Sequence, residues 1–281
     1  MKNTLLILPL LVLAAVIVYQ ATRPGPPAEE APPSAATEAK WKSLTTELEV
    51  DHLGGRVDES SAYGRYLNSL EAMDGPQLIA AWDELNSAQL PERVRERLEP
   101  SVLGALIRKE TELALTRFAT HVGDAPGGIG SQLFGGFRDL AERLPYKASQ
   151  WMDQNIAAGT FGSGAQPKLA GGTPLRVTYE RELIRSLLTN SPDQAAARLE
   201  ALPESWRSTA LQGADSPQGQ VTYARMVRKF MTPDEQMQEF KRMAASAAYH
   251  GGRNGIGQLL DRISASKEER ETITRHTPVP P

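Results

Sequence analysis

Histidines are the first side chains in this sequence that could serve catalysis or metal binding, and there are four, His52, His121, His250 and His276. A site such as H-E-x-x-H needs two imidazoles four residues apart, so that both lie on one face of a helix. No histidine here forms such a pattern with another histidine or with a carboxylate. His121 and His250 instead stand close before glycines, where a cationic side chain suits the end of a helix. We therefore predict no metal site.

Two glycine-rich stretches, Gly123–Gly136 and Gly251–Gly257, resemble phosphate cradles, because glycines before a helix expose backbone N–H groups. A phosphate loop of the familiar type also needs G-x-x-x-x-G-K-[ST] after a strand, and neither stretch has that context. We expect the first stretch to be a flexible loop between helices and the second to terminate a helix. No cofactor-binding residue and no cofactor are predicted.

Serine and cysteine chemistry is equally unsupported. Gly162-Ser163-Gly164 lacks the spacing of the G-x-S-x-G nucleophile elbow, so we interpret it as a flexible segment. The chain has 0 cysteines, which excludes disulfides, thiolate metal sites and a cysteine nucleophile. No catalytic residue is predicted, and we expect the protein not to be an enzyme.

The charge distribution argues against nucleic acid as a partner. The formal net charge is -3 and the pI is near 5.9, whereas a phosphate-binding surface needs an excess of basic residues. Arg93, Arg95 and Arg97 alternate with glutamates, which is typical of a solvated helix face.

The amino-terminal residues predict a membrane anchor. Residues 4–21 are uncharged and mostly apolar, and their length approaches the ~20 residues that cross a bilayer. Bulky Tyr19 stands where a signal-peptidase site before Ala21 needs a small residue. We expect residues 1–22 to be an uncleaved single-pass signal-anchor in a bacterial inner membrane, with the following domain extracytoplasmic. A secreted or periplasmic form after cleavage, and a cytoplasmic domain on a reversed anchor, stay open as alternatives.

Beyond the anchor, the sequence predicts a tether and then helices. Residues 23–40 are rich in proline and small residues and should form a disordered, semi-rigid spacer. From Trp41 onward apolar residues recur at helical spacing, and only a short piece around residues 175–178 alternates as a strand does. We therefore predict an all-α fold without a sheet.

The stretch Thr189–Gly213 shows the recurring construction, two short helices that meet at a proline. Ser191 is expected to cap the first helix, with Pro192 in its first turn and Gln194 completing a capping box. The second helix is expected to start at Pro203 and to stop at Gly213. Its apolar positions have helical spacing: Ala195, Leu199, Leu202, Trp206 and Ala210.

Related proline starts occur at Leu90-Pro91 and Leu144-Pro145, and a longer helix is expected between them over residues 101–120. Three tryptophans within the apolar faces are expected to be packing anchors of the core: Trp82, Trp151 and Trp206. The glycine-rich loop 159–174 is the expected boundary between helical subdomains 41–158 and 175–270. Residues 271–281 are expected to be a disordered tail.

These helical pairs resemble bacterial α-helical repeat domains of the TPR-like and HEAT-like kind. The resemblance rests on Ser191-Pro192 to Ala210, Gly75-Pro76 to Arg95, Leu144-Pro145 to Trp151, and the W-x-x-L spacing of Trp82 and Leu85. It implies stacked helical hairpins of the α-solenoid type, whose usual work is to bind other proteins. We expect a membrane-anchored scaffold for envelope proteins. An envelope enzyme or ligand-binding protein, with a site assembled from scattered polar residues, is the alternative.

Overall fold

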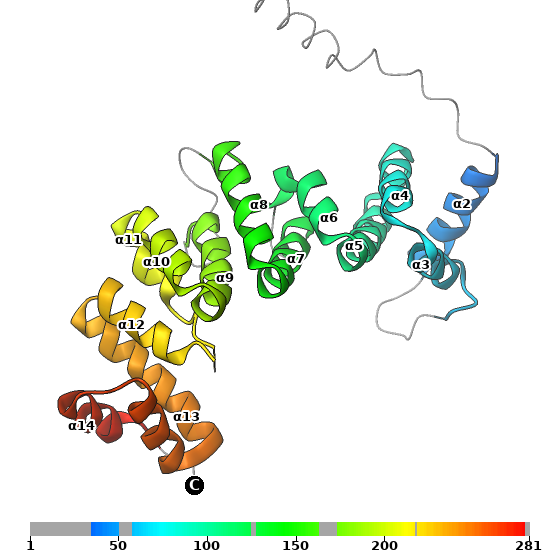
Figure 1. The fold of residues 1–281 in the computed structure, drawn as a ribbon. Coiled ribbons are helices and arrows are strands. Elements are labelled where there is room, and N and C mark those ends of the chain that lie inside the picture. Colours follow the sequence, from blue (N-terminus) through cyan, green and yellow to red (C-terminus); the bar gives the residue numbers. More distant parts are fainter. Residues whose placement is uncertain (1–34, 51–57, 125–127, 163–172, 217, 279–281) are drawn as a thin grey trace, which may run out of the picture. The chain divides into compact units, whose positions relative to one another are not determined.

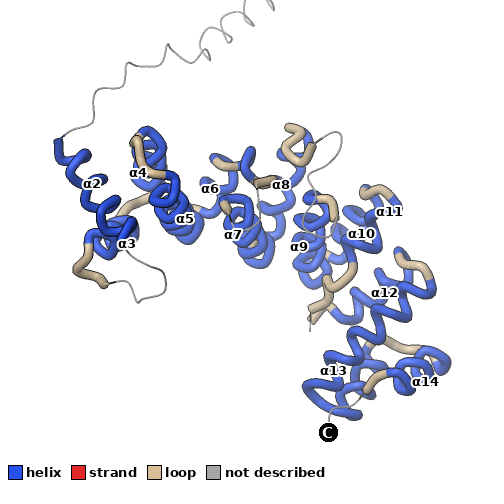
Figure 2. The backbone as a smooth tube through the Cα atoms, turned by 180° about the vertical axis from the view of Figure 1, so that it is seen from behind, coloured by secondary structure: helices blue, strands red, loops and turns tan. Residues whose placement is uncertain are grey.

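The computed structural model describes residues 35–50, 58–124, 128–162, 173–216 and 218–278 (Figure 1). In these ranges all regular structure is helical and no strand is present, so the all-α prediction is confirmed (Figure 2). The predicted anchor at residues 1–22 lies outside the described residues. None of the described helices combines the length and apolar character that a bilayer span requires.

The chain divides into two units, Met1–Asp51 and His52–Pro281. In the first unit, helix α2 spans Ala35–Val50 and therefore begins inside the segment that was predicted to be tether. The predicted apolar positions of α2 are buried: Trp41, Leu44 and Leu48.

The second unit contains the remaining described helices, which are short and follow one another closely. The first of them are α3 (Ala62–Ala72), α4 (Gly75–Ser87), α5 (Glu92–Lys109), α6 (Thr111–Arg117), the 3-10 turn η1 (Ala119–His121), α7 (Ile129–Arg143) and α8 (Pro145–Ala157). The others are α9 (Leu175–Asn190), α10 (Pro192–Ala201), α11 (Glu204–Leu211), α12 (Gln220–Phe230), α13 (Pro233–Arg262) and α14 (Lys267–His276).

Helices of the second unit pack mainly on their neighbours in sequence. The extensive contacts join α4 to α5, α5 to α6 and α7, α7 to α8 and α9, α9 to α10 and α11, and α12 to α13. Each buried face comes from positions at helical spacing, as in α9, where Leu183, Ile184, Leu187 and Leu188 are almost fully buried. The core is therefore a continuous row of small helix-to-helix contacts.

Three helices begin with a complete capping box, in which the cap side chain and the side chain three residues later each satisfy a free backbone N–H. α13 begins with such a box at Thr232 and Glu235. Those of α4 and α14 start at Asp74 and Ser266.

The predicted box at Ser191 is wrong, because Ser191 makes no side-chain cap hydrogen bond. This residue also ends α9: its N–H donates to the Leu187 carbonyl at 2.7 Å and its ψ is 71°. Ser61 and Thr232, whose side chains do make the cap hydrogen bond, have ψ of 164° and 158°, the extended geometry in which a side chain reaches the next turn. Pro192 does open α10 as predicted.

The predicted helix over residues 101–120 is also divided differently. α5 runs through Pro100 to Lys109, and the break falls at Glu110, whose φ of -139° is not helical. Pro100 cannot donate to the Glu96 carbonyl, but Glu96 is exposed, so water can satisfy that group. The hydroxyl of Thr111 donates to the Ile107 carbonyl at 2.7 Å and closes the end of α5.

The first glycine-rich stretch is largely helix rather than loop, because α7 already begins at Ile129. Its glycines permit close packing. A Cβ on Gly136 would come within 2.9 Å of the Ile107 side chain on α5, and one on Gly130 within 3.0 Å of the His121 carbonyl. The second stretch interrupts α13 as predicted, with Gly252 at φ 57° and ψ -144°, but the chain turns helical again at once.

The carboxyl-terminal boundary also differs from expectation. The carboxyl-terminal helix α14 extends to His276, so residues 271–276 belong to an ordered helix whose Ile273 is fully buried. Within the loop 159–174, residues 163–172 lie outside the described residues. The helices on the two sides of this loop are in contact, because α7 and α8 pack on α9. Phe161, at the start of the loop, is buried beside Trp151 and Tyr179.

Candidate functional site

The described histidines lie on separate elements and do not form a site. His121 Nδ1 pairs with Asp124 Oδ2 at 2.9 Å, and both side chains are more than two-fifths exposed. His276 Nδ1 donates to the Thr272 carbonyl at 2.8 Å, which is a local helix contact. His250 is exposed on α13, and His52 is outside the described residues. Within the described ranges, no three histidine or carboxylate side chains converge as a metal site would require.

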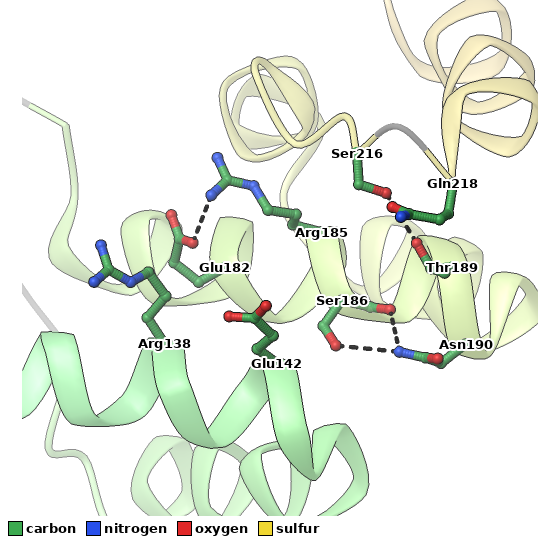
Figure 3. Close-up of a pocket in the computed structure, with 9 residues that line it drawn as sticks. All are labelled: Arg138, Glu142, Glu182, Arg185, Ser186, Thr189, Asn190, Ser216 and Gln218. Atoms are coloured by element: carbon green, nitrogen blue, oxygen red, sulfur yellow. Dashed lines mark hydrogen bonds and ion pairs between the residues drawn. The ribbon is translucent and has the colours of Figure 1, made fainter. Parts of the chain in front are cut away.

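A polar pocket of about 330 Å³ is the clearest candidate site (Figure 3). It lies between α7, α9 and the loop that connects α11 to α12. α7 contributes Arg138 and Glu142, α9 contributes Glu182, Arg185, Ser186, Thr189 and Asn190, and the loop contributes Ser216 and Gln218. The sequence analysis singled out none of these residues. The five pocket residues on α9 are spaced at i, i+3, i+4, i+7 and i+8 and therefore form one polar stripe. This stripe was the signal in the sequence that could have indicated the pocket.

The walls of the polar pocket are tied together by hydrogen bonds. Arg185 Nη2 donates to the Gly213 carbonyl at 2.9 Å, so α9 holds the start of the loop. The hydroxyls of Thr189 and Ser216 are 3.0 Å apart, and the N–H of Gly219 donates to Ser216 Oγ at 3.0 Å. Gly213 has a φ of 70°, which suits glycine and ends α11 as the sequence predicted. The pocket is thus a pre-formed feature of these elements.

Ion pairing leaves one charged group of the polar pocket without a partner. Glu182 and Arg185 pair at 3.0 Å, one turn apart on α9, and Arg138 lies 3.9 Å from Asp139. Glu142 has no cationic group within 4.0 Å among the described residues, and it makes no hydrogen bond there (Figure 3). The charged side chains that line the pocket, two arginines and two glutamates, sum to zero, and Arg185 Nε is buried without a hydrogen-bond partner in the described part of the chain.

A buried polar network stands behind the loop. The Glu239 carboxylate is 3% exposed; it accepts hydrogen bonds from the Tyr223 hydroxyl and, at 2.8 Å, from Arg242 Nε. The Tyr223 hydroxyl also lies 3.1 Å from the Leu211 carbonyl, and the Gly213 N–H donates to Glu239 Oε1 at 3.3 Å. Burial, and then the bond to Glu239, raise the pKa of Tyr223 far above its usual range. The network fixes the end of α11 against α12 and α13.

A second hollow of about 370 Å³ lies between α8, α9 and α10. Its floor is an ion pair: Arg198 Nε and Nη2 donate to the two oxygens of Glu180 at 2.8 and 3.1 Å. Arg198 Nη1 also lies 3.0 Å from Asp153. Arg176 also lines this hollow; its Nε lies 3.8 Å from Glu180 and has no hydrogen-bond partner among the described residues.

The three tryptophans have different environments. Trp82 and Trp151 are buried, as predicted for core anchors, but Trp206 is only half-buried, so its assignment to the core is wrong. The helix that carries it has eight residues and only two buried positions, Ala210 and Leu211. Trp151 is surrounded by aromatic rings and stacks on Tyr179, with ring centroids 5.9 Å apart.

Tyr179 is the centre of an aromatic cluster, which also contains Phe134, Phe137, Trp151 and Phe161. Its ring is fully buried, and its hydroxyl has no hydrogen-bond partner in the described part of the chain. Burial raises the pKa of Tyr179 well above its usual range. The cluster fills the space between α7, α8 and α9 and holds the helices that carry the polar pocket.

The hydroxyl groups that line the polar pocket are not paired with a base in the part of the chain that the structure describes. These hydroxyl groups, on Ser186, Thr189 and Ser216, contact one another or an asparagine amide, and none contacts a histidine. No protein-family model matches the chain, and comparisons with curated proteins and with solved structures find no similar protein.

Proposed function

We propose that this protein is a scaffold that binds other proteins of the bacterial envelope and carries out no catalysis. In this proposal residues 1–22 anchor it in the inner membrane, and the helical region is extracytoplasmic and built as an α-solenoid of stacked hairpins. The observation that carries the proposal is the restriction of the extensive helix contacts to near neighbours in sequence. Stacks of this kind have extended surfaces that bind segments of other proteins.

Polar interactions in the interior support the same proposal. The most buried carboxylates, Glu180 and Glu239, are held by arginines and by Tyr223, so they serve packing between helices. The alternative, an envelope enzyme or ligand-binding protein, is favoured by one observation, the unpaired Glu142 in the polar pocket.

Site-specific photo-crosslinking in cells tests the scaffold proposal. A photoreactive residue is placed in the full-length chain at three exposed positions, Tyr146, Val221 and Tyr249, and as a matched control at buried Leu103. A scaffold should give discrete adducts with other envelope proteins at one or more exposed positions and none at Leu103. The absence of protein adducts at every exposed position would contradict the proposal.

A fractionation experiment tests the location separately. The full-length protein should stay in membranes after carbonate washing, and its helical region should be digested by protease added to spheroplasts. Resistance to protease in intact spheroplasts, with digestion only after lysis, would instead support the cytoplasmic alternative.

A further inference from the structure

We propose that Asn254 is a site of spontaneous deamidation, and that this modification loosens the kink at Gly252 in the middle of α13. The proposal does not depend on the scaffold function. It is argued from the one asparagine–glycine pair of the chain, Asn254-Gly255, and from the backbone around this pair.

Deamidation begins when the backbone nitrogen of the residue after an asparagine attacks the carbonyl carbon of the asparagine side chain. The new C–N bond closes a succinimide ring, and the side-chain nitrogen leaves as ammonia with the proton of the backbone N–H. Water then adds to one of the ring carbonyls and opens the ring to aspartate or to isoaspartate. Because water is consumed and ammonia is released, the reaction needs no oxidant or metal. Glycine favours the attack, since it has no Cβ to hinder it and adopts a wide range of backbone conformations.

The side chain of Asn254 is accessible and free to rotate. It is exposed, and its carboxamide makes no hydrogen bond to a described residue. Three other asparagines donate their amide hydrogens to the carbonyl four residues earlier: Asn86 to Trp82 at 2.9 Å, Asn155 to Trp151 at 2.8 Å and Asn190 to Ser186 at 3.0 Å. The carboxamide of Asn254 has no such restraint on its way to the backbone nitrogen of Gly255.

The backbone at Asn254 lies directly after an interruption of the helix. Gly252 has φ 57° and ψ -144°, which are not helical values, so a new helical segment begins at Arg253. Asn254 and Gly255 lie in the first turn of this segment, and the N–H groups of a first turn have no partner within their helix. Ring closure requires the asparagine to leave the helical conformation. This change costs fewer hydrogen bonds in a first turn than in the middle of a helix.

Asn68 on α3 is the matched comparison. It is also exposed, and its carboxamide makes no hydrogen bond to a described residue. In contrast to Asn254, it lies within an uninterrupted helix and is followed by Ser69. The two asparagines therefore differ in the residue that follows and in the backbone, but both are open to solvent.

The modification should act on the contact between the two halves of α13. Gly255 lies so close to the first half that a Cβ on it would overlap the Ala247 carbonyl oxygen. Isoaspartate adds a methylene group to the main chain directly before Gly255. Because no space is left beside Ala247, we expect the second half of α13 to shift away and the kink to loosen.

The test is incubation of the full-length protein in detergent at neutral pH and physiological temperature, followed by peptide mapping with mass spectrometry. Asn254 should be converted at least about tenfold faster than Asn68. The product at Asn254 should include isoaspartate, which a protein-isoaspartate methyltransferase labels and which direct hydrolysis of the amide does not form. Equal rates at the two asparagines, or a product without isoaspartate, would overturn the proposal.

The variant Ser69→Gly separates the effect of the neighbouring residue from that of the backbone, because it creates an asparagine–glycine pair inside α3. In the folded variant Asn254 should still be converted several-fold faster than Asn68, whereas in urea the two rates should be similar. Equal rates in the folded variant would refute the role of the interrupted helix. Circular dichroism checks that the variant folds, and the comparison in the wild type does not depend on it.

Hydrogen exchange tests the structural consequence. Backbone amides of residues 253–262 should exchange faster in the isolated isoaspartate form than in the fresh protein, while those of α9 should be unchanged. Equal exchange over residues 253–262 in the two forms would refute the loosening of the kink.

Discussion

The α7–α9 region and the α11–α13 region are held together by different kinds of contact. The first is filled by rings, with Trp151 and Phe137 packed on Tyr179 at centroid distances of 5.9 and 4.9 Å. The second depends on the buried carboxylate of Glu239, which accepts hydrogen bonds from the Tyr223 hydroxyl, from Arg242 and from the backbone N–H of Gly213. Apolar packing tolerates small shifts, whereas a buried carboxylate destabilises the fold unless each partner is in place. The loop between α11 and α12 is therefore held by the α11–α13 region, in which the contacts must be placed more accurately.

The largest expected effect is on the aromatic region. Trp151→Ala should lower the free energy of unfolding by about 3–5 kcal/mol, because it removes a buried indole from a ring cluster. Trp206→Ala is the matched control in α11 and should cost about 1 kcal/mol or less, since this side chain is only half-buried. Urea unfolding followed by circular dichroism measures both. Equal losses for the two variants would mean that the two regions do not differ in this way.

The polar region should respond to loss of the charge that organises it. Glu239→Gln keeps the shape of the side chain but turns an acceptor into a donor that faces Tyr223 and Arg242. We expect a loss of about 2 kcal/mol, the range for a hydrogen bond to a charged group. Chemical denaturation measures this loss in the free energy of unfolding. The control Glu271→Gln, at an exposed position, should leave the free energy of unfolding unchanged. A neutral result for Glu239→Gln would show that the network does not hold α11 to α13.

Replacement of a buried tyrosine by phenylalanine should change the stability of the fold differently in the two regions. Tyr223→Phe should cost about 1 kcal/mol, because the Glu239 carboxylate loses a donor. Tyr179→Phe should be neutral or slightly stabilising, because its buried hydroxyl has no partner among the described residues. Thermal unfolding compares the pair. A larger loss at Tyr179 would reveal a partner for its hydroxyl, such as an internal water.

The smallest expected effect is a dependence on pH at α14. Burial opposes ionisation of Glu269, but the hydrogen bonds from Arg228 and from the Ser266 N–H outweigh it and lower the pKa of this carboxyl below its ordinary 4.5. A carboxyl whose pKa is lower in the folded state than in the unfolded state stabilises the fold at pH values above its unfolded pKa. This stabilisation is lost as the pH falls through the folded pKa. Glu269→Gln should therefore be less stable than the wild type at pH 7, and the difference should shrink as the pH falls through the folded pKa of Glu269, which lies below 4.5. A constant difference across this range would contradict the assignment.

The buried apolar positions of the helices could be predicted from the spacing of apolar residues alone. The buried positions of α2, α4, α8 and α9 are those with helical period, because burial of one stripe is a local property that each helix repeats. Trp206 was mispredicted because its position follows the same period on a helix too short to bury a full face. The helix expected over residues 101–120 begins earlier in the structure, because α5 continues through Pro100.

The polar features could not be predicted, because each depends on contacts between residues far apart in sequence. Glu180 meets Arg198 on the next helix, and Glu239 meets Tyr223 and Gly213 across two helix junctions. Nothing in the local pattern distinguishes these two glutamates from the exposed ones of the chain. The polar pocket is similar, since Glu142 and Gln218 come together only when α7 and the α11–α12 loop both pack on α9.

The neighbour-to-neighbour contacts of the second unit also give the chain a low contact order, because most residues that touch are close in sequence. Chains of this kind close short loops first and fold quickly, and they can open from an end without global unfolding. α14 is held chiefly by α13 and by the pair of Arg228 with Glu269. Backbone amides of α14 should therefore exchange with deuterium well before those of α9, so that protection rises from the carboxyl-terminal helix towards the aromatic region.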